Sequence, residues 1–479
     1  MMDNRNEKVC EIHKKCSGCQ LMNLEYPEQL KLKQSKVTKL LGRYGHVDGI
    51  IGMAEPLRYR NKATRAFRLR YPNKRIISGI YQSSTGAVVP ADDCLLEDKL
   101  SGQIIKDLRR LMPKYKALPY DEISRRGSVK FATVRKAAGT GEYMLTIATA
   151  SPIFPKGAEL AKELVSLHPE IKTVVQNIAG TDGKILLGEH EKPLFGDGRI
   201  TDTLMGLKFL ISSKSFYQVN PVQTEKLYSL AVEMANLKDT DRVLDCYCGI
   251  GTIGLIASKY CGEVIGVEAN SAAVKDAIKN ARLNKITNAQ FVNMDTGEFL
   301  SEMLSAGESA DVAFLDPARA GCDKRALESL VKLSPERIVY VSCNPETQAR
   351  DLGVLVKAGY KVKRIQPVDM FPFTGHVETV VLLSKGEVDS KKIRVEFSLE
   401  DMDMSEFQDG ATYPQIKEYV LEHTGLKVSN LYISQIKRKC GIEVGKNYNL
   451  PKSEDSRQPQ CPPEKEKAIR EAFKYFGMI

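Results

Sequence analysis

The sequence predicts an α/β protein of several domains, built around an open and largely parallel β-sheet. Three observations lead to this expectation. After about residue 213, helical stretches alternate with short apolar strands, which is typical of a parallel sheet covered by helices on both faces. Between about residues 57 and 212, the chain instead reads mainly as strands and hairpin turns. The length of 479 residues corresponds to about three domains at roughly 150 residues per domain.

The composition excludes several classes of protein. Hydrophobic residues make up 42% of the chain and charged residues 27%, as in an ordinary folded protein, so a mostly disordered or collagen-like chain is excluded. No stretch comes near the roughly 18 consecutive apolar residues of a membrane-spanning helix, so we expect no membrane partner. The first residues lack the apolar core of a signal peptide. We therefore expect a cytoplasmic protein.

The first quarter of the chain is basic and begins with a cysteine-bearing segment. Residues 1–115 hold 22 Lys and Arg against 12 Asp and Glu, so they carry the whole net charge of +10. Such an excess fits a polyanion such as nucleic acid, or a solvated basic face. Residues 26–45 read as one helix that ends at Gly42 or Gly45, with its apolar face formed by Leu30, Val37, Leu40 and Leu41.

Strand patterns dominate the central part. The runs TRAFRLRY and RIISGIY flank a turn at Pro72-Asn73, and VKFATVRK and EYMLTIATA flank a turn at 138–141. One helical pattern, GAELAKELVSL, interrupts them. In a regular strand, one face would carry a row of basic side chains suited to phosphate contacts, namely Arg58, Arg60, Lys62, Arg68 and Arg70. A solvated face is the alternative.

The later strands read RVLDCY, EVIGVE, AQFVNM, ADVAFLD, RIVYVSC, YKVKRIQPV and VETVVLL. No clear helix separates the last two, which indicates an antiparallel ending. Residues 386–479 form a further unit with a helix–turn–helix-like pattern over 413–441, and 453–464 reads as a loop. The predicted division is 1–55, 56–212, 213–385 and 386–479.

A glycine-rich loop in VLDCYCGIGTIGL follows a strand and opens a helix. Gly249, Gly251 and Gly254 match the dinucleotide fingerprint G-x-G-x-x-G. However, Asp245 stands where a carboxylate can face the ammonium group of a methionine moiety, as in S-adenosylmethionine. Glu268 ends the next strand and can bind ribose hydroxyls, which both NAD and S-adenosylmethionine carry. The loop alone leaves the two cofactors open.

Two further residues stand immediately beyond apolar strands. Asp316 follows ADVAFL and Cys343 follows RIVYVS. Because ligands of open parallel sheets lie beyond the carboxyl ends of the strands, both should border the cofactor crevice. A reactive cysteine facing a methyl donor is one reading, and a small buried apolar side chain is the other.

These residues and their neighbours resemble a known family. The runs SFYQVNP, LDCYCGIGTIGL, LDPARAG, SCNPETQARDL and GHVETVVLL have the order and spacing of the RNA uracil-C5-methyltransferases. The pattern C-x5-C-x2-C with a distant fourth cysteine is similar to the iron–sulfur members that modify 23S ribosomal RNA. The resemblance covers about residues 8–385. It implies a Rossmann-like class I methyltransferase sheet in 213–385, a β-rich central domain in 56–212 that contributes Cys94, an iron–sulfur segment in 1–55 and an extra α-rich unit in 386–479.

The resemblance also implies roles for single residues. Cys343 is the expected nucleophile that adds to C6 of uracil, and Glu378 is the expected base that removes the C5 proton. The apolar flanks of Glu378 should raise its pKa toward neutrality. Asp316 should touch both the cofactor and the target base. The other expected contacts of S-adenosyl-L-methionine are Gln218, Tyr247, Thr252, Glu268 and Asp295, of which Thr252 departs from the more usual Asn. Phe216 could stack on bases, although a core position is the preferred interpretation.

The cysteine pattern allows two kinds of metal site from spacing alone. Zinc bound by Cys10, Cys16, Cys19 and either Cys94 or His13 is one, and a [4Fe–4S] cluster on the four cysteines is the other. The resemblance favours the [4Fe–4S] cluster. Its expected role is to fasten the N-terminal segment to the β-rich domain and to shape a surface that faces RNA.

The predicted function is therefore methylation of uridine C5 in 23S ribosomal RNA by a monomeric enzyme. Methylation of tRNA or of several RNAs is the alternative, because many relatives carry a small β-barrel ahead of the first cysteine, and only nine residues precede Cys10 here. A non-catalytic RNA-binding assembly factor and an NAD oxidoreductase are rival interpretations of a different kind. The role of 386–479 stays open as RNA docking, packing or binding of a partner protein, since the 15 Lys and Arg of residues 391–479 nearly balance their 14 Asp and Glu.

Overall fold

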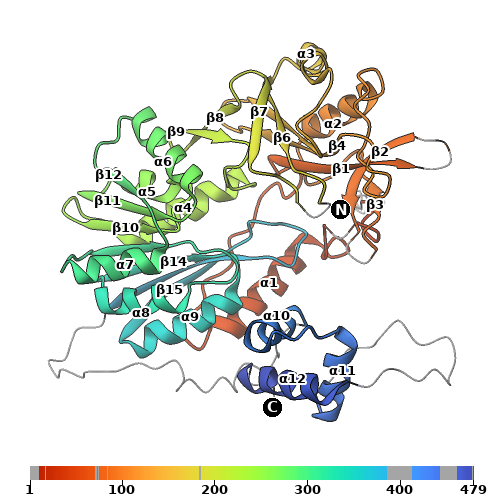
Figure 1. The fold of residues 1–479 in the computed structure, drawn as a ribbon. Coiled ribbons are helices and arrows are strands. Elements are labelled where there is room, and N and C mark those ends of the chain that lie inside the picture. Colours follow the sequence, from red (N-terminus) through yellow and green to blue (C-terminus); the bar gives the residue numbers. More distant parts are fainter. Residues whose placement is uncertain are drawn as a thin grey trace, which may run out of the picture. The chain divides into compact units, whose positions relative to one another are not determined.

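The protein forms two compact units in a computed structural model, Met1–Ser390 and Lys391–Ile479. The structure describes residues 10–16, 18–70, 73, 75–82, 85–182, 185–385, 413–442, 461–476 and 478. Figure 1 shows the elements in chain order. The division into four domains made from the sequence stays a prediction, although its last boundary lies close to the boundary between the two units.

The α/β part of the first unit is a seven-stranded sheet in the order β12-β11-β10-β13-β14-β16-β15. Its strands are β10 (Arg242–Cys246), β11 (Glu263–Glu268), β12 (Ala289–Asn293), β13 (Val312–Leu315), β14 (Arg337–Ser342), β15 (Tyr360–Val368) and β16 (Glu378–Lys385). The first five run parallel, whereas β16 is antiparallel to both β14 and β15. The predicted α/β fold and its antiparallel ending are confirmed.

Helices cover both faces of this sheet. One layer contains α4 (Pro221–Ala235), α5 (Thr252–Ala257) and α6 (Ser271–Leu283), and the other contains α7 (Thr296–Ser305), α8 (Lys324–Leu333) and α9 (Pro345–Lys357) (Figure 1). The central strands β10, β13 and β14 are buried almost without interruption, as expected of strands covered on both sides. Among the described residues, no helix is long and apolar enough to cross a membrane.

The β-rich part is a second seven-stranded sheet in the order β3-β2-β1-β4-β5-β6-β7. It comprises β1 (Lys62–Arg70), β2 (Arg75–Tyr81), β3 (Val88–Pro90), β4 (Val129–Lys136), β5 (Tyr143–Thr149), β6 (Ile171–Ile178) and β7 (His190–Phe195). The helices α2 (Lys99–Leu111) and α3 (Gly157–Leu167) pack on it, and a separate hairpin, β8 (Arg199–Leu204) and β9 (Leu207–Ser212), follows. Both predicted hairpins are present, and part of the Pro72-Asn73 turn lies outside the described residues.

The prediction that one face of a regular strand carries a row of basic side chains is wrong in part. The strand begins only at Lys62, and Arg58 has a left-handed backbone with φ of 58°. The Arg58 guanidinium donates to both carboxylate oxygens of Asp93, at 2.6 and 2.8 Å. Arg68 likewise pairs with Glu122 at 3.1 Å. These arginines therefore have carboxylate partners within the protein, so a regular strand with a free basic face does not describe this segment.

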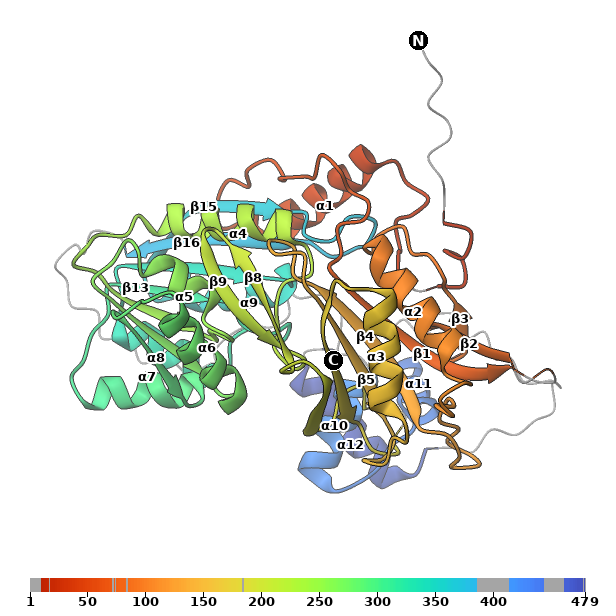
Figure 2. The same ribbon diagram turned by 90° about the horizontal axis from the view of Figure 1, so that it is seen from above.

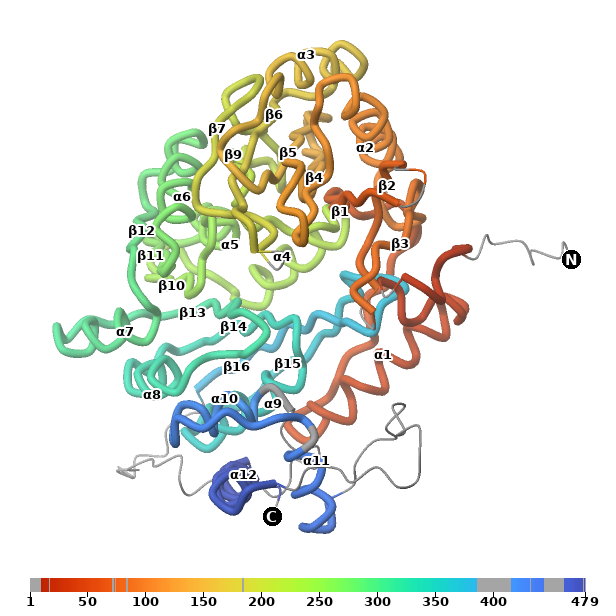
Figure 3. The backbone as a smooth tube through the Cα atoms, turned by 45° about the vertical axis from the view of Figure 1, so that its right-hand side comes forward, coloured from red at the N-terminus to blue at the C-terminus, as the bar shows by residue number. Residues whose placement is uncertain are grey.

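The first helix, α1 (Tyr26–Leu41), is confirmed, but its buried face differs from the prediction. The side chains buried along it are Gln29, Lys33, Val37 and Leu41, whereas Leu30 and Leu40 are only half-buried. Figures 2 and 3 show α1 beside β15, and it also packs on α9. Apolar periodicity alone could not identify this face because two of its members are polar.

The second unit consists of α10 (Tyr413–Thr424), α11 (Asn430–Lys439) and α12 (Pro463–Tyr475). The predicted helix–turn–helix pattern corresponds to α10 and α11, and the sequence did not predict α12. Apolar side chains from all three helices form one core, which includes Ile416, Ile433 and Phe473. Residues 453–460 of the predicted loop 453–464 lie outside the described residues.

Candidate active site

Most of the predicted site residues lie at the carboxyl ends of the parallel strands. Cys246, the last residue of β10, pairs with Val267 of β11 and with Leu315 of β13. Glu268 and Asp316 come one residue later on the neighbouring strands. The Asp316 N–H donates to the Cys246 carbonyl at 3.4 Å. The β-sheet therefore brings two carboxylates, separated by 48 positions in sequence, to one edge.

The glycine loop follows β10 and is held by the carboxylates of Asp245 and Glu268. Gly249 and Gly251 have φ of 57° and 81°, which glycine adopts at little cost. The Asp245 carboxylate accepts a hydrogen bond from the Gly254 N–H at 2.7 Å, and a Cβ on Gly254 would come within 2.8 Å of that carboxylate. Glu268 accepts from the Gly249 N–H at 3.1 Å. Burial raises the pKa of Asp245 to about 7. Hydrogen bonds from within the protein thus hold both ends of the loop.

Cys343 and Glu378 lie beside each other where β14 and β16 meet. Ser342, the last residue of β14, pairs with Thr379 of the antiparallel β16. The next step of the ladder brings Cys343 level with Glu378. Glu378 is only 3% exposed, and Cys343 is half-buried. A thiol and a buried carboxylate therefore share one wall of the site.

Burial shifts the ionisation of all three central groups. It raises the pKa of Glu378 to about 8, with a further rise from the Asp316 carboxylate. It raises the pKa of Asp316 to about 7. The pKa of Cys343 rises to about 11 because of burial and the nearby Glu378 and Asp316. Arg319 lowers the pKa of both Cys343 and Glu378. The expectation of a raised pKa at Glu378 therefore agrees with its burial.

The sequence did not identify Arg319, His376 and Tyr228 as parts of this site. The Arg319 guanidinium lies 3.3 Å from His376 Nδ1, and the Arg319 carbonyl accepts from the Asn344 amide at 3.1 Å. Tyr228 is buried in α4, and its hydroxyl is hydrogen-bonded to Gln218. The runs LDPARAG and GHVET contain Arg319 and His376, so their position in these motifs was the available signal.

Two residues of SFYQVNP differ sharply in burial. Gln218 is 8% exposed, and its carbonyl accepts from the Asn61 side chain at 3.3 Å. Phe216 is 71% exposed. The preferred interpretation of Phe216 as a core aromatic is therefore wrong, because the chain turns this ring outward while Tyr217 packs into the core. An exposed aromatic ring in this run is available for stacking on a base.

The remaining predicted cofactor contacts lie in the loops after the strands. Tyr247 follows β10 with φ of 64°, and Thr252 is the first residue of α5. Asp295 caps α7, since its carboxylate accepts from the Glu298 N–H at 3.1 Å. All three follow strands that end at the same edge of the sheet.

The four cysteines form a separate group away from this edge. A narrow cavity is lined by Cys10, Cys16, Cys19 and Cys94, together with His13 and Asp93. Burial raises the pKa of Cys19 to about 12, and the other three thiols raise it further. None of the four forms a disulfide. Within the described ranges, no group of three or more His, Cys, Asp or Glu side chains is arranged to hold a metal ion.

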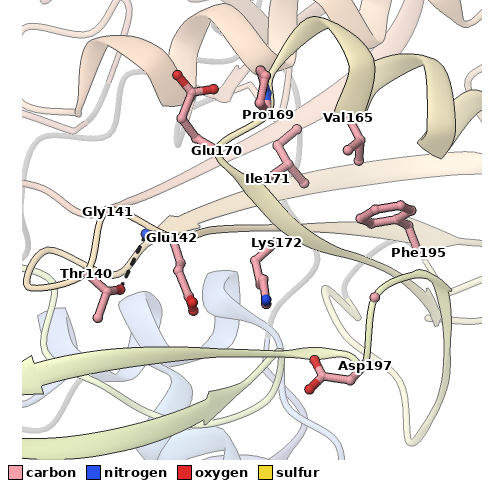
Figure 4. Close-up of a pocket in the computed structure, with 11 residues that line it drawn as sticks. Thr140, Gly141, Glu142, Val165, Pro169, Glu170, Ile171, Lys172, Phe195 and Asp197 are labelled. Atoms are coloured by element: carbon pink, nitrogen blue, oxygen red, sulfur yellow. Dashed lines mark hydrogen bonds between the residues drawn. The ribbon is translucent and has the colours of Figure 1, made fainter.

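A larger hollow of about 640 Å³ lies in the β-rich part. It is lined by residues of the β4–β5 turn, α3 and β6, and by the segment after β7. Figure 4 shows Val165 and Phe195 at one side and the charged Glu142, Lys172 and Asp197 at the other. No predicted site residue lines this hollow, so the candidate active site is the strand-end group around Cys343.

Comparisons with known proteins agree with this geometry. The tRNA (Uracil-5-)-methyltransferase family matches residues 197–386. An uncharacterised RNA methyltransferase of Clostridium acetobutylicum is 40% identical over 389 residues, which are 80% of this chain and 84% of that protein. One from Halalkalibacterium halodurans is 39% identical over 385 residues, 79% of this chain and 84% of that protein.

A solved structure is also similar. It is the Pyrococcus abyssi tRNA (uracil-54, C5)-methyltransferase in complex with S-adenosyl-L-homocysteine. The TM-score is 0.64 at 26% sequence identity, over 77% of this chain and 86% of the other.

Proposed function

Since the chain belongs to the RNA uracil-C5-methyltransferase family and is an S-adenosylmethionine-dependent RNA methyltransferase, we propose that it methylates uridine C5 in 23S ribosomal RNA through a covalent bond between Cys343 and C6 of the base. The observation that carries this proposal is the adjacency of Cys343 and buried Glu378 at the end of the β14–β16 ladder. An oxidoreductase would not need this pair.

The chemistry requires both side chains. Uracil C5 is a weak nucleophile, and addition of the Cys343 thiolate to C6 moves the ring electrons into an enolate that is nucleophilic at C5. Bound S-adenosylmethionine supplies the methyl group that C5 takes up. Glu378 then accepts the C5 proton, the C5–C6 double bond re-forms, and the C6–S bond breaks to release the thiolate. Asp316, at the same strand edge, contacts the cofactor and the base in this proposal.

The charges of the site fit these steps. With a pKa of about 11, Cys343 is mostly a thiol at neutral pH in the free protein. Arg319 already lowers that pKa, and the positive sulfonium of the cofactor would lower it further. Glu378, with a pKa of about 8, combines substantial basicity with partial ionisation near neutral pH.

Five side chains are proposed to hold the cofactor together with Asp316, namely Gln218, Tyr247, Thr252, Glu268 and Asp295. Tyr247, Thr252, Glu268 and Asp295 support this proposal because they follow strands that end at one edge of the sheet. Gln218 supports it because its side chain is buried. Glu268 has accepting capacity left beyond the Gly249 and Asn270 N–H groups, because each carboxylate oxygen accepts more than one hydrogen bond.

The four cysteines are proposed to bind a [4Fe–4S] cluster. Three come from one short segment and Cys94 from beyond β3, yet all four residues line the same narrow cavity. Four cysteines brought to one place are the ligand set of such a cluster. When bound, the cluster would supply a cross-link between the N-terminal segment and the β-rich part rather than an electron for the reaction.

The closing experiment is mass-spectrometric mapping of modified uridines in ribosomal and transfer RNA, which are extracted from cells with and without this gene. Loss of a methyluridine from 23S ribosomal RNA is the expected result. Loss from tRNA alone would transfer the proposal to tRNA, the substrate of the similar Pyrococcus enzyme.

Cys343→Ala tests the nucleophile. We expect methyl transfer to cease while cofactor binding stays as in the wild type, because the thiol lies beside Glu378 and outside the glycine loop. Retained turnover would reject the covalent mechanism.

Glu378→Gln should trap the protein–RNA adduct, which a denaturing gel would show.

A further inference from the structure

The segment between β15 and β16, residues 369–377, leads directly into Glu378 and contains His376. Its backbone is strained at Phe373, which has φ of 67° and is only 8% exposed. A bulky side chain rarely adopts this left-handed conformation, and it persists only where the surroundings enforce it. The contacts that enforce it come from the first part of the chain.

Helix α1 supplies the strongest of these contacts. The Lys33 ammonium donates to Asp369 at 2.6 Å and to the Phe371 carbonyl at 3.0 Å. The Lys33 and Asp369 side chains are both 0% exposed. Tyr26 donates to the other Asp369 oxygen at 2.9 Å. Because a buried ion pair needs its partners fully satisfied, these contacts fix the start of the segment.

The residues on either side of α1's start hold the strained part itself. The Phe373 N–H donates to the Gln29 side chain at 2.8 Å, and the Phe373 carbonyl accepts from the Leu21 N–H at 3.0 Å. The Gly375 N–H donates to the Gln20 side chain at 3.3 Å. Gln20 and Leu21 directly follow Cys19.

Phe373 also packs with the cysteine-bearing segment. It shares an apolar core with Met22, Met53 and Tyr59, and Cys19 and Cys94 pack against that core. The cysteine cavity and the segment that leads to Glu378 are therefore parts of one packed region. The start of the same segment reaches a second core, because Met370 and Phe371 pack in the core that also contains Ile250 of the glycine loop.

We propose that Lys33, Gln29 and Gln20 are positioning residues, which hold residues 369–376 and thereby place the Glu378 carboxylate for removal of the C5 proton. This inference rests on the proposed function of Glu378. It assigns to the cysteine-bearing segment and α1 a role in one step of the reaction, namely resolution of the covalent adduct.

The test uses the full chain with Lys33→Met. We expect kcat to fall about 100-fold, as a displacement of about 1 Å at a reacting group can cause, with unchanged affinity for S-adenosylmethionine. The methylated protein–RNA adduct should accumulate on a denaturing gel, labelled from the methyl group, because addition and methyl transfer proceed while elimination is slow. A purely structural role would lower all steps together and leave no adduct.

Asp48→Asn is the matched control. Asp48 also joins the N-terminal part to β15, through Arg364 at 2.8 Å, but this pair is about one-third exposed, and Arg364 lies four positions before Val368, the residue of β15 that pairs with Glu378. It should behave as the wild type.

Lys33→Met leaves a buried carboxylate without its partner and could unfold the chain. The double variant Lys33→Met/Asp369→Asn removes both charges, and Gln20→Ala truncates an exposed side chain outside that ion pair. Adduct accumulation in both supports the proposal. Wild-type turnover without adduct in both overturns it. If instead Glu378→Gln traps no adduct, the proposed function fails, independently of Lys33.

Discussion

At the scale of single residues, the site is dominated by carboxyl groups that the protein buries. Glu378 and Asp316 lie near each other at the end of β13, β14 and β16, and burial raises both pKa values toward neutral pH. Such groups bind their protons more tightly when folded than when unfolded. Their contribution to stability is therefore full at acidic pH and is lost as the pH rises through the folded pKa.

This linkage gives a prediction for Glu378→Gln. The wild type should lose stability between about pH 4.5 and 8, while the variant lacks that loss. Above pH 8, the free energy of unfolding of the variant should exceed that of the wild type by roughly 1–3 kcal/mol, since a tenfold difference in proton affinity between the folded and unfolded chain is worth about 1.4 kcal/mol. Urea unfolding at pH 5 and pH 8.5 measures this. Glu302→Gln, at an exposed position, is the control, and equal pH dependence of both variants would contradict the prediction.

Phe216 illustrates what a single sequence cannot predict. Its run SFYQVNP contains two adjacent aromatic residues, and only the folded chain shows that Tyr217 is 7% exposed whereas Phe216 is 71% exposed. Cys343, Glu378 and Asp316 were accessible to motif reasoning because strand ends and family runs carry them. Arg319, His376 and Tyr228 carry weaker local signals, since their significance depends on neighbours far along the chain.

Exposed Phe216 predicts a role in holding the target base. Phe216→Ala should raise KM for RNA about tenfold or more, because stacking of a base on an aromatic ring is worth about 1–3 kcal/mol. Cofactor affinity should not change, and Phe216→Tyr should restore binding. Tyr260→Ala, at another exposed aromatic, serves as the control. An unchanged KM in Phe216→Ala would exclude stacking.

At the scale of elements, α1 and the cysteine-bearing segment depend on partners far away in sequence. Lys33 is buried because Asp369, separated by 336 positions, supplies the counter-charge. Helix periodicity predicted the existence of α1 and its end near Gly42, but it selected an apolar face. The strands were easier to predict, since β-branched apolar runs covered on both sides are typical of this sheet.

The cysteine-bearing segment carries its own prediction. Wild-type protein purified without oxygen should contain about four iron atoms per chain, as a [4Fe–4S] cluster requires. Cys19→Ala should lose the iron and, because Gln20 and Leu21 follow directly, should also accumulate the protein–RNA adduct. Iron analysis and a denaturing gel measure the two effects. Cys461→Ala, whose thiol packs in the second unit, should change neither. Zinc in place of iron would contradict the cluster.

At the scale of the whole molecule, the chain combines two units with independent cores. The first unit holds the strand-end site, the cysteine cavity and both seven-stranded sheets. The apolar residues of the second unit's core all come from residues 416–478. The helix–turn–helix-like pattern of the sequence predicted this extra unit. Its function could not be predicted, because its basic and acidic residues nearly balance. Lys439 and Arg470 both pair with Glu466, so part of its positive charge is neutralised locally.

Separate cores predict that the catalytic unit works without the second. A chain that ends at Ser390 should keep the wild-type affinity for S-adenosylmethionine and should form the Cys343 adduct with a short uridine-containing hairpin at the wild-type rate. Calorimetric titration and single-turnover kinetics measure these. If affinity for longer ribosomal RNA fragments falls while the hairpin rate is kept, the second unit contributes to RNA docking. Since phosphate contacts release counterions, the missing affinity should then appear as a smaller dependence of binding on salt concentration. Loss of adduct formation with the hairpin would show that the two units are coupled, despite their separate cores.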